Sequence, residues 1–282
     1  MDEPVTSADT AAGTQREAAP ASAIVFGGSG LIGSRMTRLL ASRGVKDIAV
    51  ADRRPPRGQG PNVRFFPVNV REPITVPGRW DVAYNFSAVH RTPGRADERY
   101  FEKNVAGAIN VTDFCRERGI QTVVFSSSVA VYGPDERPLV EESPIGPTSG
   151  DGKSKLLAEH IHRTWYSDEP RRQLVVVRPV VVFGEGNGGF RRLRARRSAN
   201  PGRTGITASE YADELVRSIE WVRNSRAPSV TYNFAYPSTD VHPGYLVDNG
   251  YPFGADIRDG IRAQHALVRQ TRGTISAGIS AV

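Results

Sequence analysis

Residues 23–33 read Ala-Ile-Val-Phe-Gly-Gly-Ser-Gly-Leu-Ile-Gly. The first four residues are apolar, which is typical of a short strand covered on both faces. Glycines then recur at every third position, at Gly27, Gly30 and Gly33. Apolar residues at helical spacing follow as far as about residue 43. The stretch therefore predicts a strand, a tight glycine turn and a helix, which together open a nucleotide-binding α/β sheet.

Each glycine has its own task in such a turn. Gly27 permits the tight turn, Gly30 lets the backbone approach a pyrophosphate, and Gly33 lets the helix pack closely on the strand. The amides at the start of the helix, including those of Leu31 and Ile32, would face the phosphates, because a helix N-terminus favours anions. We interpret residues 27–33 as a dinucleotide-binding turn.

An acidic residue at the end of the second predicted strand supports this interpretation. Asp52 lies 25 residues after Gly27. A carboxylate there can accept hydrogen bonds from the adenosine ribose and repels a 2′-phosphate, so we predict NAD as the cofactor. Arg53 and Arg54 keep NADP as the less favoured alternative, because a guanidinium can accommodate that phosphate.

Strand–helix alternation continues along the chain. Apolar and β-branched runs predict further strands at 46–51, 63–68, 81–87, 122–126 and 174–183. Amphipathic runs predict helices at 31–43, 100–118 and 156–165. Alternation of this length predicts an α/β fold with a doubly wound parallel sheet, the Rossmann fold. Ligands of such a sheet lie at the carboxyl ends of the strands, where the strand order reverses.

Composition divides the chain into a core and its flanks. Residues 1–21 have no apolar period, so we expect a disordered leader. We expect residues 22–183 to form the NAD-binding Rossmann domain, whose core continues through about 205–235. Residues 184–204 and 236–282 would then form a small, reduced substrate-binding region and tail.

The 282 residues carry a formal charge of +7 and contain one cysteine, Cys115. A single cysteine excludes an intrachain disulfide, which favours a reducing, cytoplasmic setting. No apolar run reaches the length of a membrane span. The arginine-rich segment from Arg191 to Arg197 is either a solvated helix face or a patch facing an acidic substrate, and no nucleic-acid-binding signature accompanies it.

Other segments, together with the glycine turn, resemble the extended short-chain dehydrogenase/reductases, in particular the NAD-dependent sugar-nucleotide epimerases and dehydratases. The resemblance covers about residues 23–235. It rests on residues 27–33 (Gly-Gly-Ser-Gly-Leu-Ile-Gly), 86–90 (Phe-Ser-Ala-Val-His), 104–105 (Asn-Val), 125–128 (Phe-Ser-Ser-Ser), 131–133 (Val-Tyr-Gly) and 178–179 (Arg-Pro).

In this family a Tyr-x-x-x-Lys pair and a Ser or Thr handle the proton while NAD takes the hydride. The resemblance assigns Lys155 to the lysine and Ser128 to the hydroxyl, but Asp151 stands at the tyrosine position. A carboxylate beside positive charge stays ionised and is a weak base toward an alcohol. We therefore expect altered proton handling, with Asp151, His90, Tyr132 or a water held by Ser128 as the carrier.

Two other departures concern the reaction and the substrate. Val129 and Ala130 stand where the dehydratases have an Asp-Glu pair, which predicts against sugar dehydration by that route. Residues 186–190 resemble a compressed form of the family's loop near the substrate diphosphate. Residues 211–215 (Tyr-Ala-Asp-Glu-Leu) resemble the opening of a helix in its substrate region.

The strand ends and the resemblance together define the predicted site. The expected cofactor contacts are Gly27, Gly30, Leu31, Ile32, Gly33, Asp52, Arg53, Asn69, Val70, Ser87, Ala88, Asn104 and Lys155. The expected substrate contacts are His90, Arg91, Ser127, Asn187 and Arg191. The alternatives are a loop role for His90, bonded to backbone, and a packing role for Tyr132.

The remaining histidines point to no metal site. His160 and His162 are two residues apart and cannot share a helix face, so we expect both to be solvated. No set of His, Asp and Glu has metal-ligand spacing, and we predict no metal.

Three functions fit this sequence. The favoured one is an epimerase- or oxidoreductase-like enzyme that uses NAD on a nucleotide-linked sugar or a related metabolite. The second is a pseudoenzyme that binds the dinucleotide or a sugar nucleotide without turnover, as a sensor or partner subunit. The third is a non-redox cyclisation or elimination enzyme on the same fold. We expect a small-molecule substrate and no nucleic-acid or membrane partner. The resemblance to the family also implies a homodimer formed through the helices at 100–118 and 154–165.

Overall fold

The computed structural model describes residues 19–58, 60–88, 98–135, 137–180, 208–235 and 241–254. Four predicted substrate contacts lie outside the described residues, namely His90, Arg91, Asn187 and Arg191. The predictions for residues 1–18, 184–204, 236–240 and 255–282 lie outside them as well.

Seven parallel strands form one sheet in the order β3-β2-β1-β4-β5-β6-β7. Their bounds are β1 Ser22–Phe26, β2 Asp47–Asp52, β3 Val63–Pro67, β4 Val82–Asn85, β5 Thr122–Ser126, β6 Gln173–Pro179 and β7 Ser229–Phe234. The order reverses at β1, which pairs with β2 on one side and with β4 on the other. The predicted doubly wound parallel sheet is confirmed, and its switch point lies between the carboxyl ends of β1 and β4.

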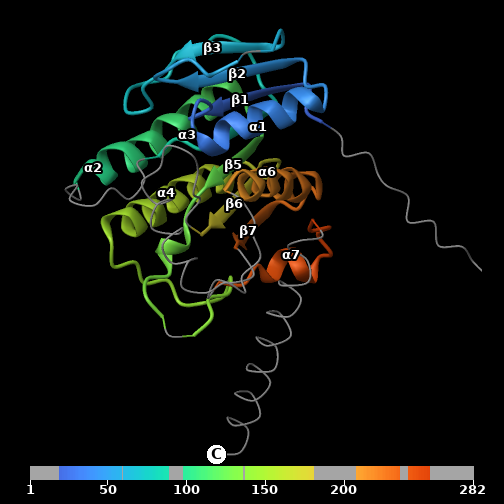
Figure 1. The fold of residues 1–282 in the computed structure, drawn as a ribbon. Coiled ribbons are helices and arrows are strands. Elements are labelled where there is room, and N and C mark those ends of the chain that lie inside the picture. The colour runs from blue at the N-terminus through green and yellow to red at the C-terminus, as the bar shows by residue number, and fades with distance from the viewer. Residues whose placement is uncertain are drawn as a thin grey trace, which may run out of the picture.

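Helices cover both faces of the sheet (Figure 1). They are α1 Leu31–Ser42, α2 Glu98–Tyr100, the π-helical turn η1 Phe101–Val105, α3 Ala106–Arg118, the 3₁₀ turn η2 Val129–Val131, α4 Gly150–Ser167, α6 Ala208–Asn224 and α7 Gly244–Asp248. α1 and α6 lie side by side on one face, whereas α3 and α4 lie on the other.

The strand residues alternate between these two layers. In β1, Ala23 and Val25 pack into the core under α1 and α6, together with Met36 of α1. Ile24 and Phe26 point the other way, and the Phe26 ring meets that of Phe114 in α3 edge to face at 5.7 Å. Because both faces are buried, the strands read as continuous apolar runs rather than alternating ones.

The last crossover of the sheet comes from the segment that resembled a substrate-region helix. Residues 211–215 do lie in a helix, but that helix is α6, which begins at Ala208 and packs against α1 and β6. The Arg35 guanidinium of α1 bonds to the Ser209 hydroxyl at 3.0 Å and lies 3.4 Å from the Asp213 carboxylate. α6 therefore covers the sheet and leads into β7, which was not predicted as a separate strand.

The turn after α6 contains a strained residue. Arg226 has φ 56°, in the left-handed region that favours glycine, and it is exposed. We expect Arg226→Gly to raise the free energy of unfolding by about 0.5 kcal/mol, because relief of backbone strain slightly exceeds the added entropy of the unfolded chain. Urea titration measures the change.

Gly119, at the end of α3, provides the matched control. It has φ 66°, and a Cβ built there meets no atom within 4 Å. Gly119→Ala should therefore lower stability by about 1 kcal/mol through backbone strain alone. A loss of stability in Arg226→Gly would contradict the strain argument.

Candidate dinucleotide and catalytic site

The glycine turn lies where β1, β2 and β4 end. Gly27 has φ +74° and donates its N–H to the Ala51 carbonyl of β2 at 2.9 Å. A Cβ on Gly27 would lie 2.8 Å from the Ser87 nitrogen, and one on Gly33 would lie 2.3 Å from the Gly27 oxygen. Real Cβ atoms do not approach that closely, so the turn and α1 can pack in this way only with glycine at both positions.

The first turn of α1 is open to an anion. Gly30, which precedes the helix, is extended at φ −77° and ψ 178°, and no side chain caps the turn. The first turn also contains no acidic residue. The amides of Leu31 and Ile32 therefore stand at the positive end of the helix, without a side-chain cap, beside a glycine backbone. This arrangement fits a pyrophosphate.

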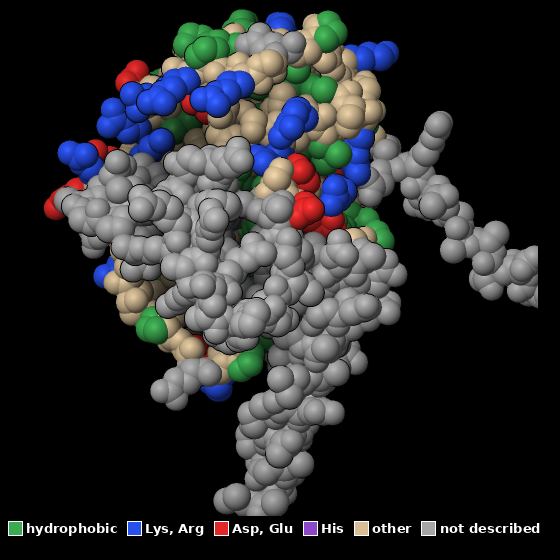
Figure 2. All heavy atoms as spheres, in the orientation of Figure 1, with side chains coloured by type: hydrophobic (Ala, Val, Ile, Leu, Met, Phe, Trp, Pro, Cys, Tyr) green, Lys and Arg blue, Asp and Glu red, His purple; other side chains and the backbone are tan. Residues whose placement is uncertain are grey.

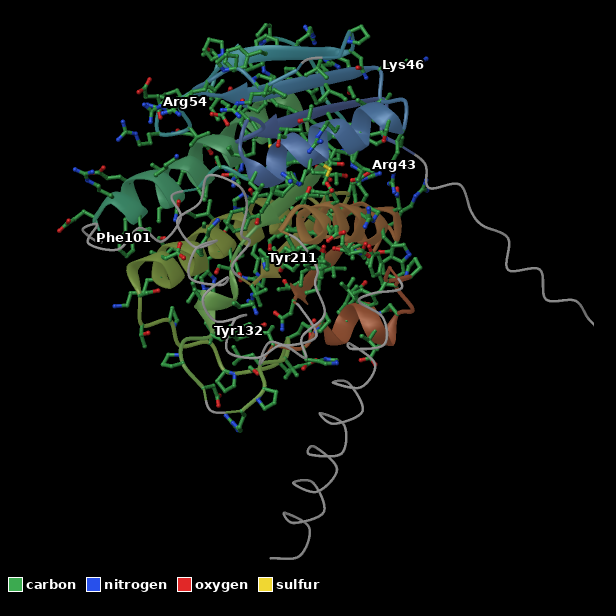
Figure 3. All side chains as sticks on the ribbon, in the orientation of Figure 1. Arg43, Lys46, Arg54, Phe101, Tyr132 and Tyr211 are labelled. Atoms are coloured by element: carbon green, nitrogen blue, oxygen red, sulfur yellow. The ribbon has the colours of Figure 1, made fainter. Side chains whose placement is uncertain are left out.

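Asp52 is fixed beside this turn at the end of β2. Its carboxylate accepts N–H bonds from Ser29 at 3.1 Å and from Arg53 at 2.7 Å. Arg53 and Arg54 are exposed, and Figure 2 shows Lys and Arg side chains gathered at the upper left of this face, where Figure 3 labels Arg54. A single carboxylate at the edge of a basic surface thus lies next to the candidate phosphate site.

The residues after β3 and β4 lie along the same edge of the sheet. Asn69 bonds through its amide to Glu72 at 2.5 Å, and Val70 is buried against Gly107 of α3. Ser87, which follows β4, donates its hydroxyl to the Asn85 amide oxygen at 2.6 Å. Asn85 is itself buried, so Ser87 is held from within the fold.

Asn85 connects this edge to helix α4 through a histidine. His162 is fully buried, so the expectation that it is solvated is wrong, whereas His160 is exposed as expected. The His162 ring stacks on Phe125 at 4.2 Å, its Nδ1 bonds to the Ala158 carbonyl at 2.7 Å, and its Nε2 lies 3.3 Å from the Asn85 amide nitrogen. Burial lowers the pKa of His162 to about 4. The histidine is therefore a neutral, structural residue.

The helix predicted over 100–118 contains a π-helical turn, η1. Asn104 lies in this turn, is buried, and donates its amide to the Ser154 hydroxyl of α4 at 2.9 Å. π-Helical turns are frequent at functional sites. Asn104 therefore ties an irregular turn to the helix that contains Lys155.

The two serines that follow β5, Ser127 and Ser128, have different surroundings. Ser128 is partly exposed, and its Oγ accepts the Ala130 N–H at 3.1 Å, which caps η2. That bond leaves the hydroxyl hydrogen of Ser128 able to donate to another oxygen. Ser127 is buried, and its hydroxyl donates to the Glu159 carboxylate at 2.5 Å. Of the two serines, Ser128 is the one with a hydroxyl suited to a ligand.

Lys155 lies in α4 next to this segment. Its side chain is nearly buried, its Nζ donates to the Ser126 carbonyl at 2.6 Å, and it lies 4.9 Å from the centre of the Phe125 ring. Burial lowers the pKa of Lys155 to about 8, although the negative charges of Asp151 and Glu159 oppose the shift. The bond to the Ser126 carbonyl uses one N–H of the ammonium, which has further N–H donors for a ligand.

Asp151 lies one helical turn before Lys155, in the first turn of α4. The Ser149 hydroxyl caps this helix by accepting the Gly152 N–H at 3.1 Å. A carboxylate in a first turn is stabilised by the helix dipole, and a residue four positions before a lysine shares its face. Asp151 therefore adds negative charge to the face of α4 that contains Lys155.

Tyr132 is buried rather than open to a ligand (Figure 3). Its hydroxyl donates to the Asn233 amide oxygen at 2.8 Å and accepts from Arg178 at 2.9 Å. Burial raises the pKa of Tyr132, and Arg178 only partly offsets this. This geometry favours the packing role over that of a proton carrier.

The sequence analysis missed one residue next to the site. Glu159, one turn after Lys155, is fully buried and accepts two bonds from the Arg178 guanidinium, at 2.9 and 2.8 Å. Burial opposes its charge, but Arg178 and Ser127 hold the pKa of Glu159 below its ordinary value. In the sequence, Arg178 stands out only as part of the Arg-Pro motif at 178–179. Glu159, four residues after Lys155, shows no sign of a role until its partner Arg178 is known.

Neither a membrane-spanning helix nor a metal-binding cluster occurs in the described part of the chain. No helix there is both long and apolar enough to cross a membrane. The same ranges contain no group of three or more His, Cys, Asp or Glu side chains arranged to hold a metal ion.

The open glycine turn, the fixed Asp52 and the switch point define a dinucleotide-binding α/β domain. Residues 23–200 match the model of the NAD dependent epimerase/dehydratase family. This chain belongs to that family.

The curated relatives are longer than the regions they share with this chain. The N-acetyl-alpha-D-glucosaminyl-diphospho-ditrans,octacis-undecaprenol 4-epimerase of Escherichia coli O157:H7 is 38% identical over 111 residues, which are 39% of this chain and 34% of that protein. UDP-glucose 4-epimerase 2 of Oryza sativa subsp. japonica is 30% identical over 188 residues, 59% of this chain and 46% of its own. The chain thus spans about a third to a half of these relatives.

Solved structures share the fold. A UDP-galactose 4-epimerase structure aligns with a TM-score of 0.62 at 23% identity, covering 75% of this chain and 76% of that one. The structure of MoeE5 in complex with UDP-glucuronic acid and NAD aligns with a TM-score of 0.60 at 21% identity, covering 77% of each chain.

The burial of His162 predicts a pH-dependent stability. Its pKa of about 4 in the folded chain lies below the ordinary 6.5, so the unfolded chain binds more protons between these values. Stability from the neutral ring is present above pH 6.5 and is lost as the pH falls toward 4. Between pH 7 and pH 5, the free energy of unfolding should fall by about 2 kcal/mol less in His162→Gln than in the wild type.

The exposed His160, on the same helix, is the matched control. His160→Gln should follow the wild-type pH dependence in urea titrations at each pH. An equal pH dependence in His162→Gln and the wild type would show that the ring titrates alike in the folded and the unfolded chain, which contradicts the lowered pKa.

Proposed function

We propose that this chain binds NAD along the carboxyl edge of its sheet and acts on a nucleotide-linked sugar or a related metabolite. The observation that carries the proposal is that three groups suited to binding a ligand lie along the carboxyl edge of the sheet. This edge combines an uncapped helix N-terminus at the glycine turn with a nearly buried ammonium at Lys155 and a serine hydroxyl at Ser128. Family membership supports the cofactor, and the nucleotide-sugar epimerases among its relatives support the substrate class.

The residues present fit a dinucleotide. The glycine turn and the amides of Leu31 and Ile32 would hold the pyrophosphate, and Asp52 would accept bonds from the adenosine ribose. Ser87, Ala88 and Asn104 would line the route from there to Lys155, whose remaining ammonium hydrogens would bind the nicotinamide ribose. Bound NAD would supply a reversible hydride acceptor. NADP remains the less favoured ligand, with Arg53 available to its 2′-phosphate.

Proton handling is where this site is expected to differ. The Ser128 hydroxyl can donate to a substrate oxygen, because its Oγ already accepts from Ala130. The Asp151 carboxylate lies at the start of α4, one turn before Lys155, so it serves better as an acceptor for a water or a substrate hydroxyl than as an acid. This differs from a phenol in both reach and basicity.

A second function is supported by the surroundings of Tyr132. Its hydroxyl is bound on both sides, by Asn233 and Arg178, so it is poorly suited to replace a phenol at position 151. Without another proton carrier the chain would bind NAD or a sugar nucleotide and release it unchanged. We keep this binding-only function as the alternative.

The test uses the purified full chain. Calorimetry with NAD and NADP measures cofactor binding, and incubation with UDP-, GDP- and dTDP-hexoses, followed by mass spectrometry and NMR, measures turnover. We expect Ser128→Ala and Lys155→Ala each to lower kcat by about 100-fold or more. Lys153→Ala, an exposed lysine on the same helix, is the matched control and should keep wild-type turnover.

Asp151→Tyr separates the two functions. If the wild type turns a substrate over and both Ser128→Ala and Lys155→Ala abolish this turnover, the enzymatic function is supported. Turnover that survives in both variants contradicts the enzymatic function. Turnover only in Asp151→Tyr, with NAD bound by both proteins, supports the binding-only alternative. No turnover in any protein that binds NAD would contradict hexose nucleotides as the substrate class.

We also propose a homodimer in a cytoplasmic setting, formed through α3 and α4. These neighbouring helices each expose a large apolar side chain, Ile109 at 45% and Leu157 at 44%. In a two-fold dimer each would occur twice, so one substitution adds two charges to the interface.

We expect the double variant Ile109→Asp, Leu157→Asp to sediment as a monomer. The control variant Ile145→Asp, which changes a residue that is 43% exposed, should stay dimeric. A dimeric double variant would exclude this interface.

A further inference from the structure

We propose that the buried Glu159–Arg178 pair is a positioning element for Lys155, acting through the peptide group that joins Ser126 to Ser127. The inference rests on the proposed function only for its consequence in catalysis. Its structural part concerns how the fold orients one ammonium group, and it can be measured without turnover.

The peptide between Ser126 and Ser127 is held at both ends. Its carbonyl oxygen accepts from Lys155 Nζ at 2.6 Å, and its N–H donates to the Val177 carbonyl of β6 at 2.8 Å. A trans peptide is planar, so a tilt of the group moves both atoms together. The orientation of this peptide therefore decides where the ammonium of Lys155 lies.

The Glu159–Arg178 pair closes a ring around this peptide. Ser127 Oγ donates to Glu159 Oε1 at 2.5 Å. Arg178, the residue after Val177, binds both oxygens of Glu159 through Nε and Nη2, at 2.9 and 2.8 Å. The ring thus runs from Ser127 to Glu159, to Arg178, to Val177 and back to Ser127.

The geometry of this ring suits orientation more than stability. A buried ion pair adds little net stability, because desolvation offsets its attraction. A bidentate guanidinium–carboxylate pair, however, fixes the plane of the carboxylate. Glu159 lies on the same helix as Lys155, one turn later. Its carboxylate therefore ties that helix to the side chain of Ser127, whose N–H belongs to the same peptide group as the oxygen that Lys155 binds.

Charged side chains of α4 and η1 act on the ammonium of Lys155. Asp151 and Glu159 of α4 favour its protonated form, whereas Lys103 of η1 disfavours it. Glu159 is already balanced by Arg178 and Arg163. A variant that keeps all these charges but breaks the ring therefore reports on position and not on net charge.

Ser127→Ala and Arg178→Lys are two such variants. NMR of ¹³C-labelled lysine in the full chain without NAD gives the pKa of Lys155, which Lys155→Arg assigns. We expect the pKa to fall by about half a unit or more in both variants, because a loosened carbonyl stabilises the ammonium less. Ser127→Thr, which keeps the hydroxyl, should restore the wild-type value.

Thr231→Val is the matched control. It removes a hydroxyl from the same cluster, where Thr231 accepts from Arg163 at 3.3 Å, but leaves the peptide ring whole. An unchanged or raised pKa of Lys155 in Ser127→Ala, or an equal fall in Thr231→Val, would overturn the proposal.

Turnover adds a second readout if the chain is active. Ser127→Ala should then lower kcat by about tenfold or more, because misplacement of a positioned group costs rate. A fall in the pKa without any turnover in the wild type supports the positioning role while contradicting the enzymatic function. The two proposals can therefore fail separately.

Discussion

The whole site depends on how closely α1 approaches the end of β1. A Cβ on Gly33 would lie 2.3 Å from the Gly27 oxygen, so this contact exists only because neither residue has a side chain. The contact brings the N-terminus of α1 to the switch point of the sheet, where the strand order reverses between β1 and β4. Asp52 and Ser87 then border the turn because their strands end beside β1. An uncapped helix terminus elsewhere on the sheet would face no such set of side chains.

Helix α4 provides the second half of the site, and its buried face is more polar than that of an ordinary covering helix. Ser154, Lys155, Glu159 and His162 are all buried there, and each has a partner from another element. Buried polar groups without partners would cost several kcal/mol each, so the partners have to be in place when the helix docks. The same bonds fix α4 against η1, β4, β5 and β6. A helix bound in this way can hold an ammonium with little freedom of movement.

Much of this could be predicted from the sequence, because local patterns and short-range motifs encode it. The glycine spacing, the apolar strands and Asp52 each depend on residues close in the chain, and the doubly wound sheet followed from their order. The buried partners could not be predicted in this way. His162 and His160 look alike in the sequence, and only the packing of α4 on Phe125 and Asn85 separates the buried ring from the exposed one. Glu159 and Arg178 are 19 residues apart and meet only because β6 lies beside β5.

The structure also shows how firmly position 151 is supported. The serine cap at Ser149, the close packing of Gly152 on Ala130, Lys155 one turn later and the ring behind it hold this part of α4 in place. Asp151 itself stands in the first turn, where the helix dipole stabilises a carboxylate whether or not chemistry occurs. The start of α4 is therefore well ordered around an aspartate at the position where the resemblance implies a tyrosine. A site that had lost its role altogether would have no physical need to keep Lys155 nearly buried at the cost of desolvating its charge.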